Sequence, residues 1–301
     1  MFTEKISPRY VELDSWSSGE MIAAMYESQL AAAAAVRGAL PAIAAAVDEA
    51  VPALQRGGRI VYVGAGTSGR IGVQDGTELP PTYNWPADRV VFAMAGGLGA
   101  LVQSTEGAED DEATGARAMA EAKIGPDDVV LGIAASGTTP YTIGALRAAT
   151  AAGAVTIAIA NNPGAPLFDA AGHRILVETG AEVIAGSTRM KAGTAHKIVL
   201  NLFSTTVMVK LGRVYRGLMV DMRARNAKLK RRAAVIVSQI VGCAAPDAAR
   251  FVEQADGDVK VAILLGFGLG PADAAKVLSR HDGNLRTAIA EVAHESRHDR
   301  D

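Results

Sequence analysis

The sequence predicts an α/β fold: a parallel five-stranded sheet sandwiched by helices, followed by a small C-terminal module of three helices. Two observations support this prediction. Short apolar runs rich in Val and Ile alternate with stretches of helical character, which is typical of parallel sheets with right-handed crossovers. Beyond Cys243 the composition changes to short helical segments joined by Gly and Asp.

Five apolar runs are the expected strands. In chain order they are RIVYV (59–63), RVVFAMA (89–95), DVVLGIA (128–134), AVTIAIA (154–160) and HRILVET (173–179). Because apolar residues occupy successive positions in these runs, both faces of the sheet are expected to be covered.

Helices are expected on both sides of this strand region. Residues 18–55 form one or two Ala-rich helices, broken or turned near Pro41. Residues 189–211 are apolar on nearly every face, which indicates a helix buried in the core or in a subunit interface. We therefore expect a domain over 1–240 with an N-terminal helical extension, and a helical module over 241–301.

The charge balance argues against several classes of partner. The chain of 301 residues is 49% apolar, and its 30 Lys and Arg nearly balance 32 Asp and Glu, for a net charge of -2. No general attraction to nucleic acid or anionic lipid follows from that balance. The run LAAAAAV (30–36) is far too short to span a bilayer, and MFTEKISPRY carries charges where a secretory signal needs an apolar core. We expect a cytoplasmic protein with no membrane partner.

A single cysteine, Cys243, excludes an intramolecular disulfide and a cysteine-ligated zinc site. This usage fits a reducing compartment. No metal site is expected.

Two loops that combine glycine with hydroxyl residues follow predicted strands. The first, GAGTSGR (64–70), satisfies G-x-G-x-x-G, which alone is weak evidence for a dinucleotide site. An acidic residue about 20 positions later should then hold the ribose, but AMAGG (93–97) supplies none. The second loop is AASGTTPYT (134–142), in which Pro140 suits the first turn of a helix. Neither loop contains the GKS or GKT of a nucleotide triphosphate site.

The two loops together predict a phosphate site. Loops at the carboxyl ends of parallel strands meet at one edge of the sheet, and each following helix start offers free N–H groups and positive potential. The candidate ligands are Thr67, Ser68, Ser136, Gly137 and Thr139. Alternatively, each Ser or Thr is a helix N-cap and each Gly closes a turn. The presence of two such loops in one sheet favours the anion site.

A third segment identifies a resemblance. GAEVIAGSTRMKAGTAHK (180–197) is similar, nearly residue for residue, to a motif shared by bacterial N-acetylmuramic acid 6-phosphate etherases and the glucokinase regulatory protein. These proteins have the sugar isomerase (SIS) phosphosugar-binding fold. The likeness to the etherases includes GAGTSGR, ELPPTY (78–83), TEGAEDD (105–111), ASGTTPY, NPGAP (162–166) and KLGRVYRGLMVDMRARNAKL (210–229). The C-terminal module resembles the ubiquitin-associated-like (UBA-like) domain that ends these enzymes.

The resemblance implies a reaction and two carboxylates. The etherases remove the D-lactyl ether from C3 of the opened sugar by elimination and then add water, without metal or cofactor. By analogy, Glu109 takes the C2 proton, and Glu78 protonates the departing lactate and then deprotonates water. Leu79, Pro80 and Pro81 are expected to shield Glu78 from water.

The resemblance also implies how the anionic groups of this phosphorylated amino sugar are held. The candidates for its phosphate and lactyl carboxylate are Ser187, Thr188, Arg189 and Lys191. Alternatively, these residues tie the helix start to the sheet or to a second subunit. The apolar helix over 189–211 and the family both suggest a homodimer.

Three departures from the family pattern keep other functions open. Thr138 stands where the family usually has Arg or Lys, and Ser28 and Gln29 replace a Glu-Asp pair. Thr77 and Leu79 replace the Ser and Cys that commonly flank the glutamate, which leaves Glu78 itself in place. Besides an etherase, the sequence is compatible with a non-catalytic phosphosugar sensor and with an enzyme that acts on another phosphosugar.

Overall fold

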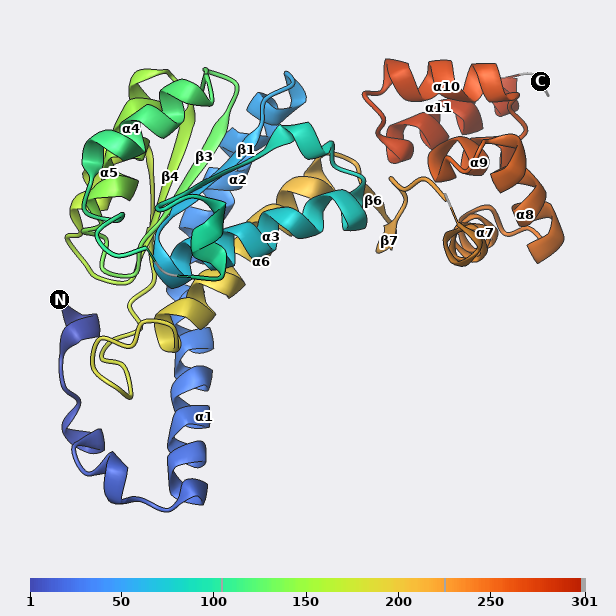
Figure 1. Cartoon of the computed structure of the whole chain (residues 1–301). Helices are drawn as coiled ribbons and strands as arrows, with labels where there is room; N and C mark the ends of the chain where they lie inside the picture. Colours follow the sequence, from blue (N-terminus) through green and yellow to red (C-terminus); the bar gives the residue numbers. More distant parts are fainter. Residues whose placement is uncertain (104, 225, 299–301) are drawn as a thin grey trace. The chain divides into compact units, whose positions relative to one another are not determined.

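The chain folds into two compact units. A computed structural model describes residues 1–103, 105–224 and 226–298. The first unit comprises Met1–Glu78 and Pro86–Val207, and the second combines Leu79–Trp85 with the chain from Met208 onward (Figure 1).

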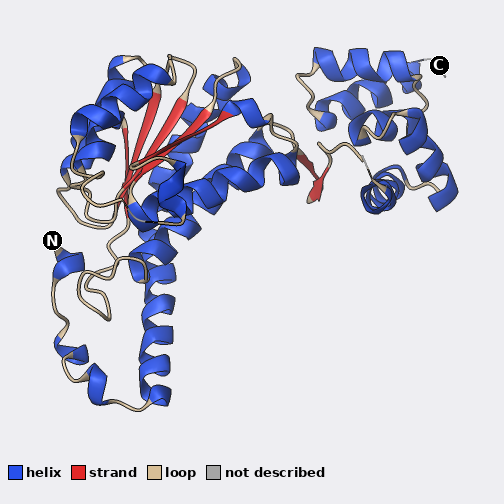
Figure 2. Cartoon of the chain, in the orientation of Figure 1, coloured by secondary structure: helices blue, strands red, loops and turns tan. Residues whose placement is uncertain are grey.

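The first unit is built on a parallel sheet of five strands in the order β2-β1-β3-β4-β5 (Figure 2). The strands are β1 (Ile60–Gly64), β2 (Val90–Met94), β3 (Val129–Ile133), β4 (Val155–Ala160) and β5 (His173–Leu176), so all five predicted strands are confirmed. Gly64 is in register with both Met94 and Ile133. The first three strands therefore end level, and the loops that follow them leave from the same edge.

Helices cover both faces of the sheet, as the apolar strands predict. One face carries α4 (Glu112–Glu121) and α5 (Pro140–Ala151); the other carries α2 (Leu40–Gln55), α3 (Gly66–Tyr83) and α6 (Lys191–Lys210) (Figure 2). Alternate residues of each strand face opposite layers. Val61 and Val63 of β1 pack with Leu146 of α5 in one buried cluster. Short 3-10 turns lie at η5 (Ala87–Arg89), η6 (Leu98–Leu101) and η7 (Pro166–Ala170).

The N-terminal region precedes the sheet with three 3-10 turns and a long helix. These are η1 (Phe2–Glu4), η2 (Pro8–Tyr10), η3 (Leu13–Ser15) and α1 (Ser18–Ala35), followed by η4 (Val36–Ala39). Ser17 and Glu20 form a reciprocal capping box at the start of α1. The break predicted near Pro41 is confirmed, because α2 begins at Leu40 after the η4 turn.

The stretch Ser18–Gln55 is long and apolar enough to cross a membrane by length and composition. Among the described residues two bent helix pairs, 227–254 and 259–280, also pass if each pair is counted as one span. This apolar stretch is longer than the run at 30–36 on which the sequence expectation depended. Its second half lies on the sheet, where Ile43, Val47 and Leu54 of α2 are buried.

A buried carboxylate joins three elements of the first unit. Asp75 of α3 accepts hydrogen bonds from the hydroxyl of Tyr62 on β1 (2.8 Å) and from Asn201 (2.9 Å) and Ser204 (3.3 Å) of α6. Burial raises the pKa of Asp75, whereas the bond from Tyr62 and the other donors oppose that shift. The network fixes α3, which carries the first hydroxyl loop, against β1 and α6.

The second unit is helical apart from a hairpin of β6 (Val214–Tyr215) and β7 (Leu218–Met219). Its helices are α7 (Ala227–Val241), α8 (Ala245–Gln254), α9 (Val259–Gly266), α10 (Pro271–Arg280) and α11 (Leu285–His298). Among the described residues, four helices thus follow residue 241, where three were expected. The first of them, α8, is strongly amphipathic and buries Ala248 and Val252.

The boundary between the units lies earlier in the chain than the expected division at 240 and 241. Helix α7 buries Ile236, Val237 and Ile240 in one apolar cluster with Ile263 and Val277. Because this face of α7 needs the later helices to cover it, α7 belongs with them. Arg213 donates to the carbonyls of Tyr83 and Asn84 and stacks over Trp85, which fastens Leu79–Trp85 to the same unit.

Two glycines allow α4 and α5 to touch. A Cβ on Gly115 of α4 would lie 2.0 Å from the carbonyl oxygen of Tyr141, and one on Gly144 of α5 would lie 2.1 Å from that of Glu112. No side chain fits at either position. This close contact fixes the position of the chain segment just before α4, and that segment includes Glu109.

We predict that Gly144→Ala destabilises the first unit and displaces that chain segment. Overpacking typically costs about 1–3 kcal/mol of unfolding free energy, which urea titration measures. The control is Gly38→Ala, because a Cβ at Gly38 meets nothing within 4 Å. Equal stability of the two variants would contradict the proposed contact.

Candidate functional site

A cavity of about 450 Å³ opens between the first and third strand-to-helix loops. Residues 65–68 lead from β1 into α3, and residues 134–140 lead from β3 into α5. Strands β1 and β3 are neighbours, although their helices lie on opposite faces of the sheet. In a sheet of this strand order, that position is the topological switch point, where α/β proteins bind ligands.

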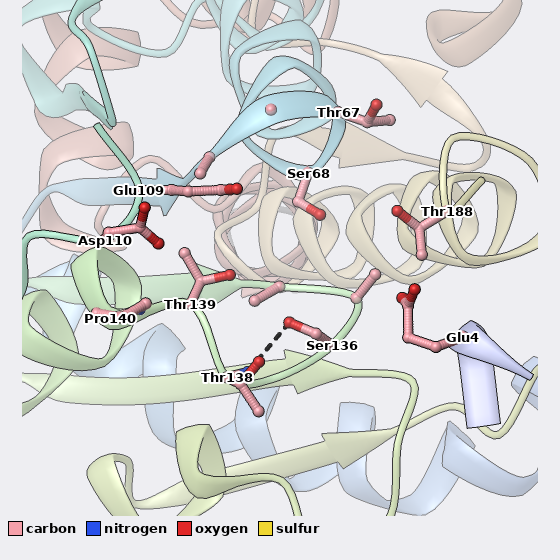
Figure 3. A pocket seen from close by; sticks show the side chains of 14 residues that line it. Glu4, Thr67, Ser68, Glu109, Asp110, Ser136, Thr138, Thr139, Pro140 and Thr188 are labelled. Carbon is pink, nitrogen blue, oxygen red and sulfur yellow. Dashed lines mark hydrogen bonds between the residues drawn. The ribbon is translucent and has the colours of Figure 1, made fainter. Parts of the chain in front are cut away.

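Hydroxyl side chains from both loops line this cavity: Thr67 and Ser68 of the first, and Ser136 and Thr139 of the second (Figure 3). The oxygen of Ser136 accepts a hydrogen bond from the backbone N–H of Thr138 at 3.1 Å. Thr139 occupies the N-cap position of α5 but makes no side-chain cap bond there, so capping does not account for its hydroxyl. Two helix N-termini with hydroxyl groups form a suitable environment for a phosphate.

Gly137 lies behind the cavity wall instead of lining it. Its φ of +71° is in the left-handed region, and an added Cβ would lie 2.3 Å from the Cβ of Ala165. The Gly137 carbonyl accepts the N–H of Leu167 at 3.0 Å. Glycine is therefore required here for the shape of the loop.

The acidic residues around the start of α4 have two different roles. Asp111 caps α4 through the N–H of Thr114 (3.0 Å), and Glu112 forms an ion pair with Arg147. Glu109 and Asp110 instead line the cavity, with exposed side chains. The N–H of Tyr141 in the first turn of α5 donates to the Glu109 carbonyl at 3.0 Å, which holds this residue beside the second hydroxyl loop.

The second predicted carboxylate, Glu78, does not line this cavity. It lies in α3 ten residues after Ser68, which corresponds to roughly 15 Å of helix rise. Its side chain is exposed, so Leu79 and the two prolines do not shield it from water as expected. Within one chain, Glu78 and Glu109 are not gathered around one cavity.

The motif before α6 contributes one cavity residue, Thr188. Ser187, Arg189 and Lys191 are not among the lining residues. The ammonium of Lys191 donates to the Ala181 carbonyl at 2.9 Å, and burial lowers the pKa of this group against the opposing effect of Glu182.

The start of α6 already has a carboxylate of its own. Glu182 is buried and accepts the backbone N–H groups of Lys191 (2.9 Å) and Ala192 (3.0 Å). These bonds favour the alternative in which the motif ties the helix start to its surroundings.

The N-terminal segment forms a wall of the cavity, which sequence reasoning missed. Glu4 lines the cavity on one side of Ser68 and Ser136, opposite Glu109 (Figure 3). Asp110 and Thr138 are further lining residues without a predicted role. Nothing local in the sequence places Glu4 there, because the other lining residues begin only at Ala65 and extend to Thr188.

Asn162 holds this wall in place. Its buried amide oxygen accepts the N–H groups of Phe2 (2.6 Å) and Thr3 (3.3 Å), while its nitrogen donates to the Thr3 hydroxyl (3.1 Å) and the Ala135 carbonyl (3.0 Å). The Thr3 carbonyl also accepts the N–H of Gly186 at 3.1 Å. One side chain therefore joins the N-terminus to the second hydroxyl loop.

A buried histidine lies directly beneath the first loop. His196 of α6 is fully buried, and its Nδ1 is 3.4 Å from the Ser68 hydroxyl. Burial lowers the pKa of His196 to about 4, so the ring is neutral at pH 7. Among the described residues, no cluster of three or more His, Cys, Asp or Glu has the arrangement of a metal site.

Known proteins are similar to this chain over nearly its whole length. Residues 42–150 match the glucokinase regulatory protein N-terminal SIS domain, and residues 108–208 match the SIS domain. The N-acetylmuramic acid 6-phosphate etherase of Deinococcus radiodurans is 51% identical over 96% of this chain and 95% of its own. Those of Rubrobacter xylanophilus and Salmonella typhi are 45% and 44% identical, over 97% and 96% of this chain and 96% and 98% of theirs. Among solved structures, a phosphoheptose isomerase from Francisella tularensis has a TM-score of 0.49 at 20% identity, over 64% of this chain and all of its own.

We predict that Asn162→Asp detaches the N-terminal wall. The substitution keeps the shape but replaces a buried donor with an acceptor that faces the Thr3 hydroxyl and the Ala135 carbonyl. The expected loss of unfolding free energy is about 2–4 kcal/mol, together with faster proteolysis near Glu4. Asn84→Asp, at an exposed turn, is the control. An unchanged proteolysis pattern would contradict the anchoring role.

Acid sensitivity provides a second test. Because the folded-state pKa of His196 is about 4 and the unfolded value is about 6.5, the unfolded state binds the proton first as the pH falls. The stability that depends on neutral His196 is present above pH 6.5 and is lost between 6.5 and 4, by up to about 3 kcal/mol. His196→Gln should remove this component, as urea titrations at pH 7 and 4.5 would show. Parallel pH dependences of the wild type and the variant would contradict a neutral buried His196.

Proposed function

Since the chain belongs to the family of N-acetylmuramic acid 6-phosphate etherases, we propose that it cleaves the D-lactyl ether of N-acetylmuramic acid 6-phosphate, giving N-acetylglucosamine 6-phosphate and D-lactate. The observation that carries this proposal is the cavity at the β1/β3 switch point. It combines six hydroxyl residues and two helix starts for a phosphate with a carboxylate, Glu109, at its edge. The near full-length identity to the etherases supports the same reaction.

The proposed chemistry needs two proton-transfer groups. In the opened sugar, the C1 aldehyde makes the C2 proton acidic, and Glu109 removes it. The electron pair forms the C2–C3 double bond as the C3–O bond breaks, and Glu78 gives its proton to the departing lactate oxygen. Glu78 then takes a proton from water as the water oxygen adds to C3, and C2 regains a proton from Glu109. No metal or cofactor takes part in the proposed route.

The separation of the two glutamates leads us to propose that the enzyme is a homodimer with shared sites. Glu78 is about 15 Å of helix from Ser68, too far to serve a sugar held at the hydroxyl loops of its own chain. A second copy that presents its exposed Glu78 to the cavity completes the pair. Each site would then contain Glu109 of one chain and Glu78 of the other.

The surface of α1 supplies a candidate contact for this dimer. Ile22, Tyr26 and Leu30 are 67%, 64% and 53% exposed, and their spacing of four residues places them along one side of the helix. Next to α1 an apolar groove of about 520 Å³ is lined by Ile6, Val11, Met21, Met25 and Ile184, among others. A second copy that covers these side chains accounts for the apolarity of Ser18–Gln55 without a membrane, in keeping with a cytoplasmic enzyme.

We predict that wild-type protein releases D-lactate from N-acetylmuramic acid 6-phosphate, and that Glu78→Gln and Glu109→Gln each lower kcat by about 10²–10⁴. A coupled assay for D-lactate measures the rates. Glu12→Gln, at an exposed position outside the cavity, should keep wild-type activity. Saturable binding of the intact sugar without lactate release would overturn the etherase proposal and favour a phosphosugar sensor. Turnover that is confined to another phosphosugar would favour the third candidate function.

Mixing the two inactive variants tests the shared sites. Subunits of Glu78→Gln and Glu109→Gln, dissociated together and reassembled, should recover about a quarter of wild-type activity, because half of the dimers are mixed and one of their two sites is complete. Each variant alone, treated in the same way, is the control. If mixed dimers form and stay inactive, both glutamates serve one chain and the shared site is wrong.

A further inference from the structure

We propose that His196 is a positioning residue for the phosphate: its Nδ1–H donates to the Ser68 hydroxyl, which frees the serine proton for the ligand. This inference deepens the proposed function and depends on Ser68 as a phosphate ligand. His196 itself is fully buried and does not line the cavity, so it acts only through Ser68.

The Ser68 hydroxyl has a single proton to donate. A hydroxyl has one donor and two acceptor positions, and the Ser68 oxygen has His196 Nδ1 at 3.4 Å on one side and the cavity on the other. If Nδ1 carries no proton, Ser68 donates to the ring and presents only lone pairs to the cavity. If Nδ1 is protonated, the ring donates and Ser68 O–H turns toward the cavity.

A phosphate selects between these two arrangements. Its oxygens accept hydrogen bonds, so a Ser68 that presents lone pairs repels the anion and one that presents its proton binds it. The other ring nitrogen, Nε2, has no hydrogen-bond partner within the described part of the chain and imposes no tautomer of its own. Phosphate binding therefore selects the tautomer of the neutral His196 ring in which Nδ1 carries the proton.

Burial favours the hydrogen bond from Nδ1–H of His196 to Ser68. His196 lies in the second turn of α6, beneath the start of α3, and is fully buried, so bulk solvent does not reach Nδ1. The neutral ring adds no cation to the site, which distinguishes it from Arg189 and Lys191 on the same segment. The ring controls only the direction of the Ser68 proton.

Two substitutions of His196 test this role, because one keeps a hydrogen-bond donor for Ser68 and the other lacks it. The amide of His196→Gln retains an N–H for Ser68, whereas His196→Leu offers none. We expect His196→Leu to raise KM for N-acetylmuramic acid 6-phosphate and the inhibition constant of inorganic phosphate about tenfold, with kcat within about twofold. His196→Gln should stay within about threefold of wild type in all three values. His173→Leu, at a partly buried histidine of β5 that pairs with Glu49 away from the cavity, is the matched control.

A double-mutant cycle separates positioning from general structural loss. In a Ser68→Ala background the serine proton is absent, so adding His196→Leu should leave phosphate affinity unchanged. Equal losses with and without Ser68 would overturn the proposal. So would an unchanged KM and inhibition constant in His196→Leu.

Nitrogen NMR of the wild-type protein remains decisive if a variant fails to fold. With ¹⁵N-labelled histidine and saturating inorganic phosphate, the Nδ1 resonance of His196 should be that of a protonated ring nitrogen. An unprotonated Nδ1 in the phosphate complex would refute the inference. This readout needs no turnover, so it stands even if wild-type protein releases no lactate, the result that would sink the proposed etherase instead.

Discussion

The order of the strands is the constraint on which the candidate site depends. Because β1 lies between β2 and β3, the chain leaves β1 toward one face of the sheet and leaves β3 toward the other. The loops that follow β1 and β3 therefore diverge at the carboxyl edge of the sheet, and the space between them forms the cavity. Two helix N-termini, at Gly66 and Pro140, then point positive potential at the same space. A protein with a net charge of -2 thereby gains a local environment for an anion without a lining cation.

Several contacts keep that edge rigid. Asp75 fastens α3 to β1 and α6, Gly115 and Gly144 bring α4 against α5, and Asn162 connects the N-terminus to the second hydroxyl loop. Each is a buried polar group with its hydrogen bonds made, or a backbone contact that excludes any side chain. Such contacts hold ligand groups more precisely than loops alone, because each allows little variation in geometry.

Uncharged hydroxyl groups and charged carboxylates occupy different parts of the candidate site. Hydroxyl side chains line the cavity, and the carboxylates of Glu109 and Glu4 lie on opposite sides (Figure 3). Charge-neutral donors suffice for a phosphate at two helix starts. Glu109 is exposed at the edge and forms no ion pair within the described part of the chain, so its carboxylate is free for the proposed proton transfer. Glu78 is exposed on α3 and would join this arrangement in the proposed homodimer, which makes assembly part of the proposed chemistry.

Sequence alone determined the fold class, the five strands, both hydroxyl loops and the family. Periodicity and short motifs are local properties, so they can be read without knowledge of distant contacts. Only the tertiary structure decided what those residues do together. It brought Glu4 into the cavity, put Ser68 over His196, assigned Lys191 to the Ala181 carbonyl, and placed α7 with the C-terminal helices. It also separated Glu78 from Glu109. These outcomes depend on strand order and on packing between segments far apart in the chain, which no local pattern records.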